Sequence, residues 1–351
     1  MSLLVSACVP EQAPATFELT HVVPTPGPMR AMTVLESGPN SKLAFVSGFQ
    51  PRLLVFARLP FGDFVQAASS TVGAGPRAVV VVQDRLVTAN ASGEGLSVAR
   101  FEDGPFEDTL EVEATVGLTT APFHVAARSG SSRVFVTLGL TDEDRTIRVF
   151  ERSGSTLLAA VEPTPVQGAV SCAVEDFDRD GDDDALVLSP ANSTATLLEA
   201  EDDRLRVRDT FSTCPTAFSA KVADVDGNGS RDAVLACRSG GVDVLFDPFE
   251  PKNRRRLHLD GGDTLYDAAA DDFDGDGSID LAGVDLAGSV FVWLGRDALS
   301  SSTSFSVSRG PIAIEAMDVE GDGDVDLVVL GFETRAFEVL ENTLMTGGIN
   351  S

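Results

Sequence analysis

The sequence predicts an all-β fold, a seven-bladed β-propeller with four-stranded blades that forms a single domain over residues 15–345. Two observations lead to this prediction. Short runs of β-branched or alternating residues recur roughly every ten residues, separated by Gly, Pro, Asn and Ser. Four acidic segments, which begin at Asp176, Asp224, Asp272 and Asp318, follow one another at intervals of 48, 48 and 46 residues.

Each repeat has the length and content of one propeller blade. Steps of about 47 residues backwards from Asp176 end near Ser129, Val82 and Leu35, so the chain divides into seven units. The third unit shows the pattern, with strands expected at 122–128, 133–138, 146–151 and 155–161. Four strands in a period near 45 residues is typical of a blade that stacks on its neighbours around an axis.

The two ends of the domain complement each other. The last unit supplies strands at 311–317, 326–331 and 336–341 and lacks a fourth, while the segment 15–23 precedes the first unit and has the character of a strand. We therefore predict that this N-terminal strand completes the last blade, because ring closure removes exposed sheet edges. Two separate β-sandwich domains are the alternative. Residues 346–351 are expected to form a tail.

Composition excludes several classes of function. Acidic residues outnumber basic ones 54 to 26, which gives a net charge of −28. Such a field repels phosphate backbones and anionic lipid headgroups and attracts cations, so no nucleic-acid partner is expected. No apolar stretch reaches the roughly 18 residues of a membrane-spanning helix, so no transmembrane segment is expected either.

The N-terminus and the cysteines point to an exported protein. Val5-Ser6-Ala7-Cys8 is similar to a bacterial lipobox, so residues 1–14 are expected to be a truncated signal and tether with a lipid anchor at Cys8. The expected location is the bacterial cell envelope or the secreted fraction. Of the other cysteines, the repeat register favours a Cys214–Cys237 disulfide, and the alternative is that these two and Cys172 are buried free thiols.

The four acidic segments have the composition of cation-binding loops. They read DFDRDGDDD, DVDGNGSRD, DFDGDGSID and DVEGDGDVD, with an oxygen-bearing side chain at positions 1, 3, 5 and 9 and Gly at position 6. Crowded carboxylates repel one another unless a cation neutralises them, and Ca²⁺ takes six to eight oxygen ligands in a flexible geometry. Magnesium fits less well because it demands a near-octahedral site. With the backbone carbonyl of position 7 included, the candidate ligands of up to four Ca²⁺ ions are Asp176, Asp178, Asp180, Asp182, Asp184, Asp224, Asp226, Asn228, Ser230, Asp232, Asp272, Asp274, Asp276, Ser278, Asp280, Asp318, Glu320, Asp322, Asp324 and Asp326.

These loops resemble the calcium-binding loops of FG-GAP and VCBS repeats, which occur in integrin α-subunit propellers and in many bacterial surface proteins. The resemblance implies a calcium-binding propeller and covers about half of the chain, because blades one to three have short turns instead. An EF-hand is not indicated, since position 12 holds Val187, Leu235, Gly283 or Val329 rather than Glu. Glu320 at position 3 and Asn228 at position 5 depart from the pattern and are expected to weaken those two sites.

The sequence contains no recognisable catalytic constellation. Its three histidines, His21, His124 and His258, fall in different units, and only three lysines occur. The primary hypothesis is an exported, calcium-stabilised, monomeric propeller that serves as a rigid binding or adhesion scaffold for a protein or other macromolecule. The alternative is an extracellular propeller enzyme of lyase or hydrolase type, with a site at the channel mouth near His124. A purely structural module of a cell-surface assembly is a third hypothesis.

Overall fold

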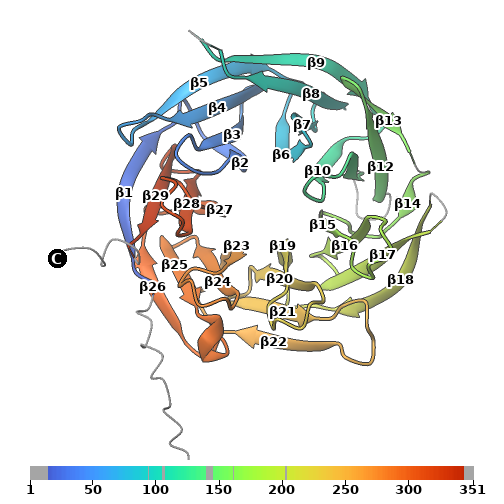
Figure 1. Cartoon of the computed structure of the whole chain (residues 1–351). Helices are drawn as coiled ribbons and strands as arrows, with labels where there is room; N and C mark the ends of the chain where they lie inside the picture. Colours follow the sequence, from blue (N-terminus) through green and yellow to red (C-terminus); the bar gives the residue numbers. More distant parts are fainter. Residues whose placement is uncertain are drawn as a thin grey trace, which may run out of the picture.

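The described residues of the chain form seven antiparallel sheets arranged in a ring around a central axis (Figure 1). The structure is a computed structural model, and it describes residues 15–93, 95–104, 107–139, 145–160, 162–201 and 204–343. The fold prediction of an all-β propeller with seven four-stranded blades is confirmed. The expected signal and tether at 1–14, with Cys8, and the expected tail at 346–351 lie outside the described residues.

Every blade runs from the axis outwards in the same strand order. The innermost strands are β2 (Met29–Glu36), β6 (Pro76–Val82), β10 (Pro122–Ala126), β15 (Ser171–Glu175), β19 (Ala217–Ala223), β23 (Leu265–Asp271) and β27 (Pro311–Met317). The second strands are β3 (Lys42–Ser47), β7 (Arg85–Asn90), β11 (Arg133–Leu138), β16 (Asp184–Ser189), β20 (Asp232–Cys237), β24 (Asp280–Asp285) and β28 (Asp326–Gly331). The third strands are β4 (Arg52–Arg58), β8 (Gly95–Glu102), β12 (Thr146–Ser153), β17 (Thr194–Glu201), β21 (Val242–Phe246), β25 (Ser289–Trp293) and β29 (Ala336–Asn342). The outermost strands are β5 (Phe64–Thr71), β9 (Thr109–Gly117), β13 (Thr156–Ala159), β18 (Arg204–Ser212), β22 (Arg255–Leu259), β26 (Ser302–Ser306) and β1 (Phe17–Pro24).

Two short elements complete the described chain. Blade three has an additional two-residue strand, β14 (Thr164–Pro165), which pairs with β12. A single turn of 3₁₀-helix, η1 (Gly295–Asp297), follows β25. Within the described residues there is no helix with the length and apolar character needed to cross a membrane.

The ring closes as the sequence predicts. Strand β1 pairs antiparallel with β29, from Phe17 opposite Asn342 to Pro24 opposite Ala336, so the N-terminal strand completes the last blade. Figure 1 shows the first and the last strands of the chain side by side in this blade. Because β1 pairs with the outer side of β29, that third strand has a partner on both sides.

The hydrophobic core lies between blades rather than at the axis. One cluster of buried side chains occupies each junction between neighbouring blades in the described structure. Phenylalanines contribute heavily: Phe45 and Phe56 of blade one pack around Phe337 of blade seven, with ring centroids 5.0 and 5.4 Å from it. Second strands such as β16 and β28 are buried along their whole length because a blade covers each of their faces.

Cys214 and Cys237 form a disulfide within blade five, with their Cα atoms 6.0 Å apart. Cys214 precedes β19 and Cys237 ends β20, so the bridge joins the two strands at one end of the blade, as the repeat register indicates. Cys172 on β15 is a buried free thiol, and burial raises its pKa to about 12.

Candidate metal centre

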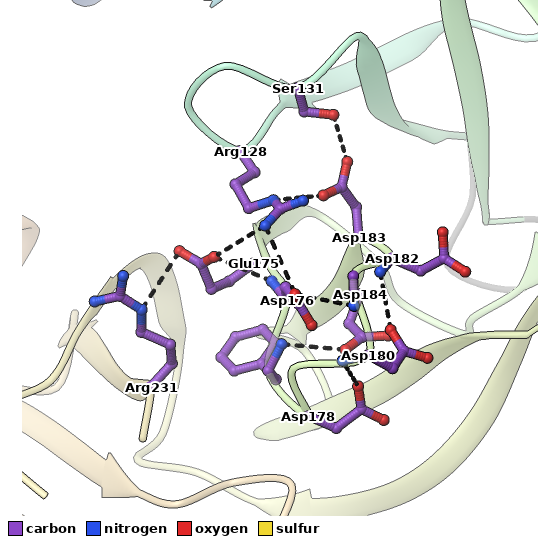
Figure 2. A network of polar contacts seen from close by, with 12 residues as sticks. Arg128, Ser131, Glu175, Asp176, Asp178, Asp180, Asp182, Asp183, Asp184 and Arg231 are labelled. Atoms are coloured by element: carbon purple, nitrogen blue, oxygen red, sulfur yellow. Dashed lines mark hydrogen bonds and ion pairs between the residues drawn. The ribbon is translucent and has the colours of Figure 1, made fainter. Parts of the chain in front are cut away.

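Each acidic segment forms the loop between the first and second strands of a blade. The loops span residues 176–183, 224–231, 272–279 and 318–325, and position 9 is in each case the first residue of the second strand. All four therefore lie on one face of the ring, at the end where the innermost strands finish. We call this the acidic-loop face. Figure 2 shows the blade-four loop from close by.

The four loops share one pattern of internal hydrogen bonds. The carboxylate at position 1 accepts the N–H of the glycine at position 6, over 3.1 Å for Asp176 and 2.8 Å for Asp272. That glycine has a positive φ, 101° for Gly181 and 88° for Gly277. Residues with a side chain adopt this backbone conformation only at a cost in free energy. The side-chain oxygen at position 5 accepts the N–H of position 7 in every loop. This folding curls the backbone around the side chains of positions 1, 3 and 5.

The aspartate at position 9 fastens the loop to the body of the blade. In blade six, Asp280 is fully buried and accepts N–H groups from Phe273 at 2.8 Å and from Gly295, beyond the third strand, at 2.7 Å. The corresponding pairs of hydrogen bonds recur in the other three loops, on Asp184, Asp232 and Asp326. Position 9 is thus a structural residue as well as a candidate ligand.

Burial among other carboxylates makes the position-9 aspartates hard to ionise. Desolvation, followed by the negative charge of neighbouring loop residues, raises the pKa of Asp184 and Asp280 to about 7, and desolvation raises that of Asp232 to about 6. The pKa of Asp326 rises to about 8, again chiefly through burial and with Glu320 contributing. Backbone hydrogen bonds oppose these shifts. A bound cation would remove the repulsive part of this cost.

The structure brings three acidic side chains of each loop together, with their oxygens within 4.8 Å of one another. In blades four and five these are positions 1, 3 and 9, as Asp176 with Asp178 and Asp184 illustrates. Blade six instead brings together positions 1, 3 and 5, whereas Asp280 stays with its backbone donors. Blade seven brings together positions 3, 7 and 9, the side chains of Glu320, Asp324 and Asp326.

The two departures from the loop pattern have visible consequences. The longer side chain of Glu320 joins Asp324 and Asp326 in place of position 1, so the blade-seven cluster has a different composition. The side-chain amide of Asn228 donates to both oxygens of Asp247, at 3.2 Å each. Asn228 therefore makes a structural contact that an aspartate at this position could not make.

Two buried carboxylate oxygens in these clusters fit a cation. The Oδ1 atoms of Asp176 and Asp224 are buried and make no hydrogen bond within the described structure. A buried acceptor without a donor is costly, and a hard divalent ion would satisfy both atoms with the ligand type that Ca²⁺ prefers. The donor sets of these loops therefore suit calcium.

Arginines beside position 3 were not anticipated from the sequence. Arg208 on β18 lies 3.6 Å from Asp178, Arg255 on β22 lies 2.7 Å from Asp226, and Arg296 in η1 lies 3.1 Å from Asp274. Each arginine comes from beyond the third strand of the same blade, at no fixed distance along the chain from its loop. Because no regular spacing separates each loop from its arginine, the ion pair with position 3 becomes visible only in the folded blade.

Blade four has a further polar network that ties it to both neighbouring blades (Figure 2). Arg128, from the turn of blade three, lies 2.5 Å from Asp183, and Ser131 of the same turn donates to that carboxylate. Arg231, from the loop of blade five, lies 3.8 Å from Glu175. The acidic loop of blade four is therefore held in place from two sides.

Blades one to three place a basic residue at the corner where blades four to seven place the position-9 aspartate. The first residue of the second strand is Lys42 in β3, Arg85 in β7 and Arg133 in β11. Lys42 is nearly buried and pairs with Glu36 and Asp103, and Arg85 contacts Glu113 at 2.7 Å. Arg133 reaches across to Asp182 of the blade-four loop, at 3.4 Å. In these three blades a side chain provides the cation.

His124 lies on the innermost strand of blade three, as the sequence indicates. Burial at the narrow centre of the ring, with the Lys221 ammonium as a smaller influence, lowers its pKa to about 4. Lys221 on β19 forms an ion pair with Glu315 on β27, 3.0 Å away, although the innermost strand of blade six lies between these two strands in the ring. The centre of the ring is therefore crossed by charged side chains.

The basic run near His258 lies on the exposed outer strand of blade five, and several of its side chains pair with acidic or aromatic neighbours. Arg254 lies 2.6 Å from Asp209, and Arg255 stacks on Phe246 with its guanidinium carbon 3.4 Å from the ring centre. His258 lies 2.8 Å from the buried Asp243. The Arg254–Asp209 pair links blade five to the outermost strand of blade four.

Comparison with known proteins agrees with the fold and with part of the loop pattern. The FG-GAP-like repeat family matches residues 272–329, from the first position of the blade-six loop to strand β28. No curated protein sequence matches the chain. Among solved structures, the WD40 β-propeller domain of Doa1 is similar with a TM-score of 0.65 at 13% identity, covering 93% of this chain and 97% of that one.

A second similar structure is BBS1N, solved in complex with ARL6DN and soaked with lead. Its TM-score is 0.64 at 11% identity, and the match covers 92% of this chain and 96% of that chain. At these identities the likeness concerns the fold alone. The chain is thus a seven-bladed β-propeller in which residues 272–329, in the sixth and seventh blades, are similar to the FG-GAP-like repeat family.

Proposed function

We propose that this protein is an exported β-propeller in which up to four Ca²⁺ ions stabilise blades four to seven, and that it serves as a rigid binding scaffold for a macromolecular partner. The ligands would come from positions 1, 3, 5, 7 and 9 of the four loops. When bound, the ion would supply positive charge and no reactive group. The protein's own residues shape the loop through the hydrogen bonds of positions 1, 5 and 9.

One observation carries the calcium proposal: the same corner of the blade holds a cationic side chain in blades one to three and a cluster of carboxylates in blades four to seven. Lys42 and Arg85 neutralise their acidic neighbours directly. The clusters around Asp184 and Asp232 contain three carboxylates each and include buried oxygens without hydrogen-bond donors. Arg208 and Arg255 each approach only position 3 of their loops, so an external cation would neutralise the remaining carboxylates.

Two features support export and a scaffold role. The Cys214–Cys237 disulfide is a bond that persists in oxidising compartments, where free Ca²⁺ is also plentiful. The closed ring packs every blade on two neighbours and joins the first strand to the last, which favours a rigid surface. The lipid anchor at Cys8 stays part of the proposal, as that residue lies outside the described structure.

The calcium proposal is tested by thermal unfolding in 2 mM Ca²⁺, in 2 mM Mg²⁺ and in excess EDTA. A site with free Ca²⁺ at 100 times its Kd adds about 2.7 kcal/mol to the free energy of unfolding, so calcium should raise the Tm by several degrees and magnesium by less. Replacing the four position-1 aspartates (Asp176, Asp224, Asp272 and Asp318) by Asn should abolish most of this difference.

The matched control removes four exposed carboxylates outside the loops, as Glu18→Gln, Glu111→Gln, Asp260→Asn and Glu333→Gln. It makes the same change in net charge and should keep the full effect of calcium. The proposal fails if EDTA leaves the Tm of the wild type unchanged, or if the control loses the calcium effect as completely as the loop variant does.

A further inference from the structure

The second residue of most innermost strands lies at a β-bulge. Register shifts in the pairing of the first and second strands occur at this place in six blades of the described structure, and the residues concerned are Arg30, Arg77, Phe123, Phe218, Tyr266 and Ile312. A bulge leaves a residue out of the regular pairing and redirects its side chain. Since the innermost strands all run in one direction, these residues surround the channel at the face opposite the acidic loops. We call this end the arginine mouth.

Positive charge is concentrated at one side of the arginine mouth. Arg77 and Arg145 both stack on Phe123, with guanidinium carbons 4.4 and 4.7 Å from the ring centre. The pKa of the Arg77 guanidinium is lowered by burial, with further contributions from the charges of Arg30 and Arg145. Three arginines thus lie close enough to repel one another, in a protein whose net charge is −28.

The other side of the mouth has a third stacked arginine, Arg238. Arg238 lies between Phe218 and the single tyrosine of the chain, Tyr266, with its guanidinium carbon 3.7 and 3.9 Å from the two ring centres. Its Nε atom is buried and makes no hydrogen bond within the described structure. Stacking holds the guanidinium planes in place while leaving N–H groups available to a carboxylate, which an arginine can bind through two parallel hydrogen bonds.

Apolar surface continues outwards from the same mouth. Phe49, in the loop between β3 and β4, is 74% exposed and lies beside Phe332 of blade seven, with ring centroids 6.0 Å apart. The Gly48 N–H donates to the carbonyl oxygen of Pro28 at 2.8 Å, which places this loop next to the start of β2 and to Arg30. Exposed aromatic rings beside arginines are typical of the centre of a protein-binding surface.

We propose that the arginine mouth binds an acidic peptide segment of a partner protein, with carboxylates on Arg30, Arg77 and Arg238 and apolar side chains on the neighbouring aromatic rings. An anionic ligand would relieve the repulsion between these neighbouring guanidinium groups, which favours its binding. The aromatic rings favour a peptide over a small polar anion. The proposal rests on the scaffold role proposed above but not on calcium, because the mouth lies at the opposite face from the acidic loops.

The test uses the whole protein, in 2 mM Ca²⁺, and biolayer interferometry. One sensor holds a pool of nonapeptides with Asp or Glu at alternate positions and a random mixture of Phe, Leu, Gly and Ser between them. A matched sensor holds Asn or Gln at the acidic positions, and a third holds polygalacturonate as an anionic polysaccharide. We expect the acidic peptide pool to retain at least ten times more protein than either of the other two sensors.

Variants locate the binding at the mouth. Arg30→Gln with Arg77→Gln should lower retention on the acidic pool at least tenfold, and the single change Arg30→Glu, at an exposed position that leaves the core intact, should lower it severalfold. The control Arg206→Gln, at an exposed arginine on β18 that pairs with Glu201, should stay within twofold of the wild type. Thermal unfolding of each variant shows that the loss is in binding and not in folding.

Three results would overturn the proposal: equal retention on the acidic and amide pools, retention on polygalacturonate alone, or unchanged retention in both the Arg30→Glu and the double variant. Asp142, Glu143 and Asp144 precede Arg145 in sequence and lie outside the described residues, so the experiment is repeated with all three neutralised. Selective retention by either form supports the proposal, and retention by neither contradicts it. A protein that fails this test and still gains stability from Ca²⁺ would leave the calcium proposal standing.

Discussion

Blades one to three and blades four to seven differ in the charge of the residue that begins the second strand. Both groups of blades have the same strand order and the same buried second strands, and both place an ionisable residue at the first position of the second strand. In the first group this residue is Lys42, Arg85 or Arg133, which pairs with carboxylates nearby. In the second group it is an aspartate that accepts backbone N–H groups and lies among further carboxylates.

The difference shows that the acidic loops are not needed to close a blade. A two-residue turn between β6 and β7 serves blade two, with Val82 opposite Arg85. The longer loops add a concentration of side-chain oxygens to the connection. Under the calcium proposal, the stability of blades four to seven should depend on divalent cations, whereas that of blades one to three should not.

The largest effect is expected at position 9. Asp280→Ala would leave the buried N–H groups of Phe273 and Asp274 and the partly buried N–H of Gly295 without their acceptor, at a cost of about 1–3 kcal/mol for each buried donor. We expect a loss of about 3–5 kcal/mol in the free energy of unfolding, measured by urea denaturation, in EDTA as well as in Ca²⁺. Asp276→Ala, with the position-5 side chain removed, should reduce stability mainly in Ca²⁺. If Asp280→Ala is harmful in Ca²⁺ alone, position 9 acts only as a ligand.

A pH effect is expected in the half without acidic loops, at His124. Its folded-state pKa of about 4 lies below the ordinary value of 6.5, so the native state favours the neutral ring. The resulting stability is fully present above pH 6.5 and is lost as the pH falls towards 4, by about 1–3 kcal/mol at roughly 1.4 kcal/mol for each pH unit. His124→Gln removes the titrating group.

The measurement compares the free energy of unfolding of the wild type and His124→Gln from pH 7 to pH 4.5 in EDTA. The variant should lose less stability over this range, since all carboxylates titrate equally in both proteins. Parallel curves would show that His124 is protonated in the folded state as readily as in the unfolded one.

A smaller effect is expected at the basic corner of blade one. Lys42→Met keeps the apolar stem of a side chain that is only 8% exposed and removes the charge that faces Glu36 and Asp103. Because both partners are substantially exposed, the loss should be about 1 kcal/mol, and it should be the same in Ca²⁺ and in EDTA. A loss that appears only in Ca²⁺ would mean that the two kinds of blade are coupled.

The smallest effect is expected in blade five, where Asn228 interrupts the carboxylate pattern. Asn228→Asp adds a ligand charge but faces Asp247, whose oxygens now accept hydrogen bonds from the amide at 3.2 Å. The added charge should raise the calcium affinity of this loop severalfold and lower stability slightly in EDTA, because two carboxylates then face each other. Isothermal titration of Ca²⁺ into both proteins checks the affinity, and an unchanged weakest site would contradict the expectation.

Much of the architecture could be predicted from the sequence because each blade is a local unit. Strand β27 spans Pro311–Met317 and β11 spans Arg133–Leu138, the ranges expected from alternation and turn residues. The strands expected at 146–151 and 155–161 differ from β12 and β13 by a few residues, and β14 was not expected. The ring closure followed from counting strands, since a blade that lacks one strand needs a partner from elsewhere in the chain.

The number of blades, the closing strand and the acidic loops could be predicted from the amino-acid sequence, because they depend on periodicity and on spacing within about ten residues. The folded ring was needed to show which side chains of each loop converge, that Arg208, Arg255 and Arg296 lie beside position 3, and that Arg30 and Arg77 lie at bulges near the opposite face. Such contacts join residues far apart in the chain, as Lys221 and Glu315 do across the centre of the ring. They depend on how separate strands and blades are placed around the axis, and nothing in the local sequence encodes that placement.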